Sequence, residues 1–177
     1  PNYRMPSAKI VALLLWEKAK DFIQRAFTII FIATIIIWFL QTFDTRINVV
    51  EDSADSMLAM VGRFIAPIFE PLGFGDWRVA TALISGFSAK EAVVSTISVL
   101  LNTGMSSLSQ ALGAMFTPLT AASFLTFTLL YTPCVAAVAT IKREMHSSFL
   151  TLLIVIAQCV VAWLAAFAVF NLGSLIL

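Results

Sequence analysis

Two adjacent charges interrupt a largely apolar part of the chain in Ser85-Gly86-Phe87-Ser88-Ala89-Lys90-Glu91-Ala92-Val93-Val94-Ser95-Thr96. An ionised Lys or Glu at the centre of a membrane helix costs about 3 kcal/mol on insertion scales, so such residues normally face a protein interior or a water-filled path. The stretch therefore predicts a polar site inside a membrane domain. A helix break is expected at Ser85-Gly86, because Gly weakens a helix and frees local backbone groups.

A continuous helix through this stretch would place Glu91 on one face with Ser88, Ser95 and Ser98, while Lys90 points elsewhere. A carboxylate beside hydroxyls can replace part of a cation's hydration shell, so the pattern predicts the wall of an ion path. The alternative is structural, with both charges paired to a missing part of a longer chain. Besides Glu91 as a candidate metal ligand, the candidate path residues are Ser85, Gly86, Ser88, Lys90, Ser95 and Thr96.

The composition is typical of a membrane protein. Hydrophobic residues make up 60% of the 177 residues and charged residues only 12%, and the mean hydropathy is +0.95. No Asp, Glu, Lys or Arg occurs between Arg25 and Asp44, between Glu91 and Lys142, or after Glu144. About 20 apolar residues are enough to cross a bilayer, so these gaps leave room for several spans.

Several functional classes are excluded by what the sequence lacks. A net charge of +1, without a basic cluster interleaved with aromatics, gives no sign of a nucleic-acid partner. Cys134 and Cys159 both lie in apolar runs, so no secreted disulfide framework is implied and Cys159 is expected to pack.

No G-x-x-x-x-G-K-[ST] phosphate loop occurs, so no catalytic role is expected. The start at Pro1, without Met or a signal-peptide pattern, favours a piece of a longer protein.

The hydropathy pattern predicts an all-α fold, a polytopic membrane protein with about four long membrane helices and short interfacial helices. Residues 1–21 mix Lys and Glu with apolar residues after a Ser7 cap, which predicts an amphipathic interfacial helix on the cytoplasmic face. Residues 22–177 form the membrane domain. Its spans are expected at 22–43, 77–101, 119–141 and 149–170, with Asp76 capping the second and Asn171-Leu172-Gly173 ending the last.

The basic residues indicate that one of these elements does not cross the membrane. With a basic amino terminus inside, four successive crossings would put Lys142 and Arg143 outside, against the positive-inside rule. The Gly-interrupted region 62–101 is therefore expected to fold as a re-entrant hairpin or broken helix. Transporters place substrate sites at such discontinuous segments.

A proline predicts a second site in Leu129-Leu130-Tyr131-Thr132-Pro133-Cys134. Pro133 has no N–H, so the carbonyl of Leu129 loses its helical partner and the helix should kink. A thiol beside a free carbonyl and a Tyr hydroxyl suits a borderline metal such as Fe²⁺ better than Na⁺ or Mg²⁺. Packing is the alternative for the Cys134 thiol. Besides that thiol as a candidate metal ligand, the candidate path residues here are Leu129, Tyr131, Thr132 and Pro133.

Five motifs occur in order along the chain: Tyr3-Arg4-Met5-Pro6, Trp16-Glu17-Lys18-Ala19-Lys20-Asp21-Phe22, Pro71-Leu72-Gly73-Phe74-Gly75-Asp76-Trp77-Arg78, Gly86-Phe87-Ser88-Ala89-Lys90-Glu91 and Tyr131-Thr132-Pro133-Cys134-Val135-Ala136-Ala137. Together they resemble the carboxy-terminal membrane region of the ferrous iron transport protein B family, with its second gate domain of the nucleoside-recognition type. The resemblance covers nearly the whole chain.

The resemblance implies uptake of Fe²⁺ across the bacterial cytoplasmic (inner) membrane by a multi-pass protein. Fe²⁺ is then the transported ion and not a tightly bound cofactor. GTP and Mg²⁺ would bind an amino-terminal GTPase domain that this chain does not contain. The Cys of the Pro-Cys motif is a candidate iron ligand in this family, a role that falls on Cys134, with Glu91 as the nearby acidic candidate.

The same resemblance implies the partners. They are the lipid bilayer and the rest of the same polypeptide, namely the first gate and the GTPase domain, so that this chain forms half of the ion path. Small cytoplasmic accessory proteins and an oligomeric assembly are compatible with it. The alternative function is a gate-type membrane module that binds a nucleoside-like solute or serves helix assembly, with Cys134 as a packing residue.

Overall fold

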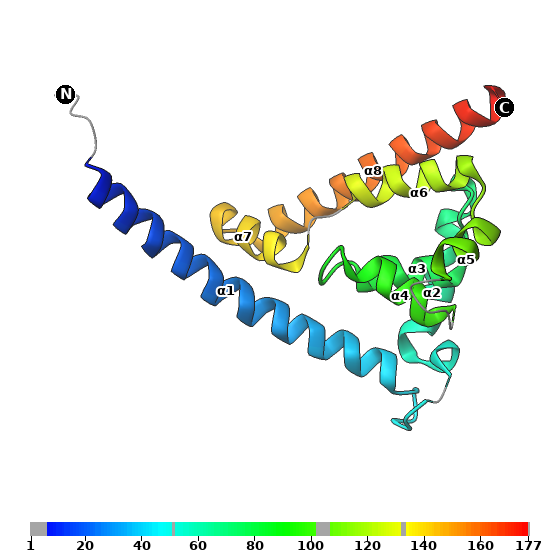
Figure 1. The fold of residues 1–177 in the computed structure, drawn as a ribbon, viewed down its shortest axis with the longest axis horizontal. Helices are drawn as coiled ribbons and strands as arrows, with labels where there is room; N and C mark the ends of the chain where they lie inside the picture. Colours follow the sequence, from blue (N-terminus) through cyan, green and yellow to red (C-terminus); the bar gives the residue numbers. More distant parts are fainter. Residues whose placement is uncertain (1–6, 51, 102–106, 132–133, 177) are drawn as a thin grey trace.

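The computed structural model describes residues 7–50, 52–101, 107–131 and 134–176. In these ranges every regular element is a helix, and turns and an isolated bridge between Phe43 and Val49 lie between the helices. The expected all-α class is thereby confirmed. The elements, shown in Figure 1, are α1 (Ala8–Thr42), η1 (Ser53–Asp55), α2 (Met57–Ile65), η2 (Ala66–Leu72), α3 (Trp77–Ser85), α4 (Ala92–Leu100), α5 (Leu108–Met115), α6 (Pro118–Leu130), α7 (Val135–Met145) and α8 (Ser148–Ile176).

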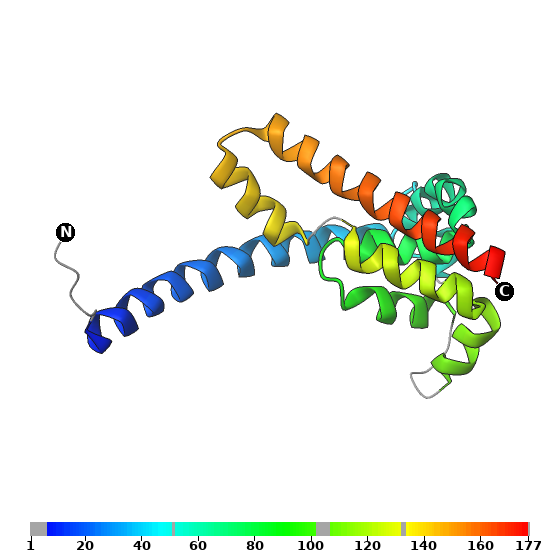
Figure 2. The same ribbon diagram turned by 90° about the horizontal axis from the view of Figure 1, so that it is seen from above.

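Helix α1 is a single long arm that projects from the rest of the molecule (Figures 1 and 2). It begins where expected, since the Ser7 Oγ accepts a hydrogen bond from the Ile10 N–H at 3.4 Å. The expected boundary between residues 21 and 22 falls inside this unbroken helix of 35 residues. The interfacial placement of residues 1–21 stays a prediction.

Helices α6 and α8 pack along each other through small residues. Ala162 and Ala166 of α8 are fully buried, and the Ser123 Oγ of α6 donates to the Ala166 carbonyl at 3.1 Å. A Cβ added at Gly173 would overlap the Leu119 side chain. Small side chains let two membrane helices approach closely, so this pair forms the best-packed seam of the fold.

The expected end of the last span, at residues 171–173, was wrong, because α8 continues to Ile176. The polar side chains there hydrogen-bond within the helix and do not end it. The Asn171 Nδ2 donates to the Phe167 carbonyl at 2.9 Å, and the Ser174 Oγ donates to the Asn171 carbonyl at 2.8 Å. Gly173 is retained inside the helix, where it faces α6.

A sharp bend separates residues 57–72 from α3. The two helical pieces meet at 107°, a geometry of a broken span or a re-entrant loop. Gly73 turns the chain with a φ of +85°, in the left-handed region that favours Gly. Trp163 of α8 fixes the bend, since its Nε1 donates to the Ile68 carbonyl at 2.9 Å.

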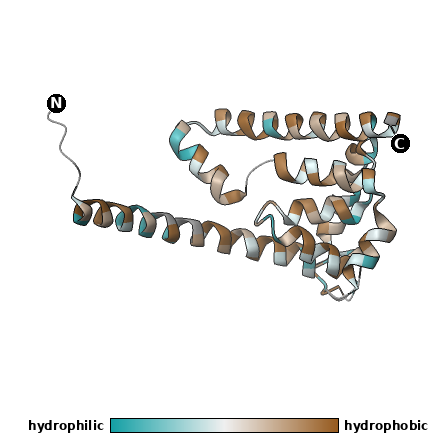
Figure 3. Ribbon diagram, turned by 45° about the horizontal axis from the view of Figure 1, so that its top comes forward, coloured by the Kyte–Doolittle hydropathy of each residue, from teal (hydrophilic) through white to brown (hydrophobic). Residues whose placement is uncertain are grey.

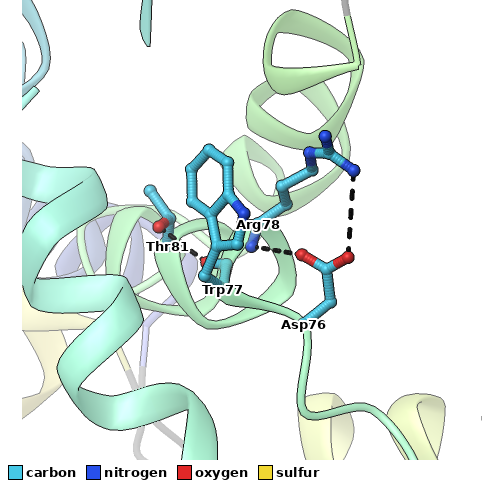
Figure 4. Close-up of polar contacts among 4 residues, drawn as sticks. All are labelled: Asp76, Trp77, Arg78 and Thr81. Carbon is cyan, nitrogen blue, oxygen red and sulfur yellow. Dashed lines mark hydrogen bonds and ion pairs between the residues drawn. The ribbon is translucent and has the colours of Figure 1, made fainter. Parts of the chain in front are cut away.

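Asp76 caps α3 as the sequence predicts (Figure 4). One carboxylate oxygen accepts from the Arg78 N–H at 2.7 Å, and the other lies 3.9 Å from the Arg78 Nη1. Asp76→Ala is expected to lower the free energy of unfolding by about 1 kcal/mol, because an N–H of the first turn loses its acceptor. Unfolding of the detergent-solubilised protein would measure this. Asp76→Asn keeps an acceptor oxygen and should lose much less; equal losses would contradict the capping role.

The stretch expected as a span at 77–101 is broken in the middle. α3 and α4 have nine residues each, and residues 86–91 join them without continuing either helix. Ala82 of α3 packs against Val93 and Ile97 of α4, so the two form a helical hairpin. Each helix is too short to cross a bilayer alone.

Four helices long and apolar enough to span a membrane were expected, and the described residues contain fewer. By length and composition two stretches qualify, Pro118–Met145, which is α6 taken together with α7, and Ser148–Leu175 of α8, and a third is added if the bent pair counts as one span. The apolar part of α1, Phe27–Thr42, is shorter. Hydrophobic residues dominate α8 and the carboxy-terminal half of α1, while hydrophilic ones gather at the α7–α8 turn (Figure 3).

Aromatic side chains form the core beside the bend. Phe69 stacks on Phe74 with ring centroids 5.5 Å apart, and Phe127 meets Phe69 edge-on at 5.1 Å. In contrast, large apolar side chains along α1 and α8 are exposed, for example Phe27 at 69% and Leu164 at 54%. Exposed apolar helix faces of this extent are typical of contact with lipid.

Candidate functional site

The two predicted sites lie side by side in the fold. Residues 86–91 reach the point where α6 ends and α7 begins, and the Val135 N–H donates to the Phe87 carbonyl at 2.9 Å. A cavity of about 390 Å³ between α1 and this contact is lined by Phe87, Val135 and apolar residues of α1. We call residues 86–91 together with 128–131 and 134–135 the gate junction.

Lys90 joins the two halves of the gate junction. Its Nζ donates to the main-chain carbonyls of Thr128 at 3.1 Å, Leu129 at 3.3 Å and Tyr131 at 3.4 Å. The same ammonium lies 4.8 Å from the centroid of the Tyr131 ring. The last carbonyls of a helix lack partners within it and carry the negative end of its dipole, so a Lys there is stabilising.

This contact corrects the geometry expected from the sequence at Leu129. The Leu129 carbonyl does lie at a helix end, but it is not free, because Lys90 donates to it. Lys90 was expected only to point off the Glu91 face, and its ammonium is directed to the carbonyls at the end of α6. Among the described residues, its partners are carbonyl oxygens and an aromatic ring and not a carboxylate. The alternative, in which both charges pair with a part of a longer chain outside this sequence, stays a prediction.

The single polar face expected around Glu91 is not formed either. The helix breaks at residues 86–91, so Ser88 belongs to the connecting segment while Ser95 and Ser98 belong to α4. Ser88 and Ser98 are buried, whereas Glu91 and Ser95 are exposed. A helical wheel holds only while the helix is continuous.

The remaining hydroxyl candidates lie around the same break. Ser85 and Thr96 are buried, and the Ser85 Oγ donates to the Thr81 carbonyl at 3.2 Å. The Ser88 Oγ donates to the Ser85 carbonyl at 2.8 Å. The Ser85 and Ser88 hydroxyls thus satisfy main-chain carbonyls near the break. A role for Ser85, Ser88 and Thr96 in an ion path stays a prediction.

Cys134 and Glu91 lie at the starts of two different helices. Cys134 is half-buried at the start of α7, where its carbonyl accepts from the Ala137 N–H at 2.9 Å. Glu91 is exposed where α4 begins. In the described part of the chain, no group of three or more His, Cys, Asp or Glu side chains could hold a metal ion. The expected ligands Cys134 and Glu91 therefore stay predictions, and Thr132 and Pro133 lie outside the described residues.

Tyr131 holds the gate junction together, a role that the sequence did not reveal. Its ring stacks on Phe127 at 5.4 Å, and its hydroxyl donates to the Leu83 carbonyl of α3 at 3.4 Å. A Cβ added at Gly86 would lie 2.7 Å from that hydroxyl, so only Gly fits there. Leu83 and Gly86 are more than 40 residues away along the chain, and nothing in the local pattern pairs them with Tyr131.

Two further cavities flank the site. One of about 470 Å³ is lined by apolar residues of η2, α3, α6 and α8, among them Cys159 and Trp163. The other, of about 360 Å³ at the α7–α8 turn, is lined by Ala139, Lys142, Arg143, His146, Ser147 and Ser148. The first has the lining of a site for an apolar group, and the second presents a basic surface.

Comparison with known proteins identifies the family. The family described as "Gate: Nucleoside recognition" matches residues 23–148, which is more than half of the chain. The chain belongs to this gate family. The matched range contains the whole gate junction and ends where α8 begins. No solved structure is significantly similar to the gate chain.

Curated relatives of the gate chain are named as iron transporters. The chain is 40% identical over 176 residues to a protein of Staphylococcus aureus (strain MSSA476) and 33% identical over 183 residues to one of Methanocaldococcus jannaschii, both named "Fe(2+) transporter FeoB". Each alignment covers 99% of this chain but only 26% and 27% of the relative. The gate chain thus spans about a quarter of the length of these relatives, and the expected resemblance is confirmed.

A third relative carries a fused name. It is the "Fe(2+) transport protein A/Fe(2+) transporter FeoB fusion protein" of Porphyromonas gingivalis, 26% identical over 223 residues, with 99% of this chain and 26% of the relative covered. The gate chain is therefore similar to one portion of several larger transport proteins.

Proposed function

We propose that this chain is the membrane part of a Fe²⁺ uptake transporter and forms half of its ion path. The observation that carries the proposal is the match over 99% of the chain to proteins named as Fe²⁺ transporters. The gate chain has no catalytic role in this proposal. GTP and Mg²⁺ act on a GTPase domain elsewhere in the longer protein.

The path runs past the gate junction. The thiol of Cys134 is the soft ligand that suits Fe²⁺ among the divalent metals, and Glu91 supplies a carboxylate on the neighbouring segment. The described residues contain no complete ligand cluster, so further ligands come from the first gate or another part of the same polypeptide. In this proposal each half of the ion path supplies only some of the Fe²⁺ ligands, so that the ion binds weakly enough to be released.

The basic residues and the arrangement of the helices support one topology in this proposal. The α7–α8 turn, with Lys142 and Arg143, lies toward the same end of the molecule as the start of α1 (Figures 1 and 2). With that end in the cytoplasm, α1 leads outward, α3 and α4 form a re-entrant hairpin, α6 and α7 lead inward and α8 returns to the outer side. The carboxy terminus of the chain then lies outside, in a bacterial cytoplasmic membrane.

The partners in this proposal are lipid, the rest of the polypeptide and a small cytoplasmic accessory protein. The fused name of the Porphyromonas relative supports the last of these, since fusion joins proteins that act together. No nucleic acid takes part.

Replacement of Cys134 in the full-length protein tests the proposal. Cys134→Ser is expected to lower Fe²⁺ uptake about tenfold or more, as loss of a group that holds a metal does. The readout is Fe²⁺ uptake by cells or proteoliposomes at matched membrane abundance. Cys159→Ser is the matched control, because Cys159 lines an apolar cavity beside α8 and should not change uptake. Normal uptake in both variants would refute the metal role of Cys134.

A nucleoside-like solute is the second candidate, because the family is described as nucleoside recognition. The cavities argue against it. The cavity of about 470 Å³ beside α8 and another of about 520 Å³ between α4, α5 and α6 are lined mainly by apolar side chains, which offer few donors or acceptors for a base or ribose. Inhibition of Fe²⁺ uptake by a nucleoside would favour this candidate, and the absence of inhibition would favour iron.

A further inference from the structure

We propose that Lys90 is a tethered cation that closes a carbonyl-lined cation site at the end of α6, and that transported Fe²⁺ enters this site when Lys90 leaves it. The inference rests on the proposed function and adds to it a residue that controls access. It also assigns a new site, formed by the main-chain carbonyls of Thr128, Leu129 and Tyr131 with the Tyr131 ring face.

The geometry is that of a cation site. Three carbonyl oxygens converge on one ammonium nitrogen at 3.1, 3.3 and 3.4 Å. Rings of main-chain carbonyls replace the hydration shell of permeating cations in channels, and the negative end of a helix dipole adds to their field. The face of the Tyr131 ring, 4.8 Å away, adds a further attraction for positive charge.

Lys90 is held in a way that allows it to leave. It lies on residues 86–91, between two helices and within neither, and its side chain is only half-buried. Its contacts to the three carbonyls lie near or beyond the upper end of the usual 2.7–3.2 Å range for N–H···O bonds. A Lys ammonium on a flexible stem acts as a point charge that can exchange between partners.

The site lies on the route proposed for Fe²⁺. Tyr131 precedes Cys134 by three residues, and Val135 bonds to Phe87 of the segment that carries Lys90. A divalent ion and an ammonium repel each other strongly at such short range, so one site cannot hold both. With Lys90 in place, only a fraction of the transporters can accept Fe²⁺, and the apparent affinity falls by that fraction.

A second interpretation is that Lys90 only caps α6. The two interpretations differ in what the charge does. Lys90→Gln removes the charge but keeps a side-chain donor that can still cap the carbonyls, whereas Lys90→Arg keeps the charge. If Lys90 only caps α6, both Lys90→Gln and Lys90→Arg should leave Fe²⁺ uptake close to that of the parent. If Lys90 is a tethered cation, Lys90→Gln should change Fe²⁺ uptake much more than Lys90→Arg does.

The experiment uses the full-length transporter in proteoliposomes, with Fe²⁺ uptake measured with and without GTP. For Lys90→Gln we expect the KM for Fe²⁺ to fall about tenfold and uptake without GTP to rise, which is within the usual range of site-to-site coupling. Lys90→Arg keeps the charge, so its KM is expected to stay closer to that of the parent than the KM of Lys90→Gln does. Lys142→Gln removes the same charge from an exposed position in α7 and should change neither quantity.

Two outcomes would overturn the inference: an unchanged KM in Lys90→Gln, with or without a loss of thermal stability, or equal changes in Lys90→Gln and Lys142→Gln. The parent and Cys134→Ser, assayed in parallel, separate this failure from failure of the proposed function. If the parent takes up Fe²⁺ and Cys134→Ser does not, while Lys90→Gln behaves like the parent, only the role of Lys90 is refuted. If the parent takes up no Fe²⁺, the proposed function is refuted.

Discussion

Tyr131→Ala is expected to lower the free energy of unfolding by about 3–5 kcal/mol, the cost of truncating a buried aromatic side chain. The Tyr131 side chain is 7% exposed and stacks on Phe127. Its removal leaves a cavity where α3, α6 and the gate junction meet, and takes from Lys90 the ring that faces its ammonium. The measurement is thermal or denaturant unfolding of the protein in detergent.

Tyr131→Phe is the control for this prediction. It keeps the ring, its stacking and its contact with Lys90, and removes only the hydroxyl that donates to the Leu83 carbonyl at 3.4 Å. A long hydrogen bond of this kind contributes about 1 kcal/mol or less, so Tyr131→Phe should remain close to the parent. If Phe were as damaging as Ala, the hydroxyl and not the ring would be the group that holds the junction together.

Gly86→Ala is expected to lower the free energy of unfolding by about 1–3 kcal/mol, because an added methyl group overpacks a filled space. The new Cβ would overlap the Val93 side chain and lie 2.7 Å from the Tyr131 hydroxyl. Both neighbours are buried: Tyr131 belongs to the gate junction, and Val93 of α4 is only 2% exposed. Room for the methyl group requires α4 or Tyr131 to move, which the unfolding midpoint and the membrane abundance would both report.

Gly113→Ala is the matched control. Gly113 lies in α5, and a Cβ added there meets nothing within 4 Å. Ala is a better helix former than Gly by about 0.8–1 kcal/mol, so this variant should be slightly more stable than the parent. Equal destabilisation at both positions would contradict the packing argument for Gly86.

The sequence determined the class of the protein and several of its local features. Composition and charge gaps are averages over long segments, so they indicated a helical membrane protein without any knowledge of packing. Helix caps depend on neighbours two or three residues away, and the caps expected at Ser7 and Asp76 are both present. The weakness expected at Gly86 is likewise local, and the chain does break there.

The tertiary structure decided which residues meet in the gate junction. The break at residues 86–91 separates Ser88 from Ser95, so the polar face that was predicted for one continuous helix is not formed. The carbonyl of Leu129 accepts a hydrogen bond from Lys90, which is 39 residues away in the chain. α8 runs past its expected end to Ile176, and Gly173 there packs against Leu119 of α6, a contact that the local pattern does not show. A periodic pattern reports which face of one helix is apolar, but it carries no information about which distant segment meets that face. Here the meeting of a helix end with a charged loop depends on how α3, α4, α6 and α7 pack together.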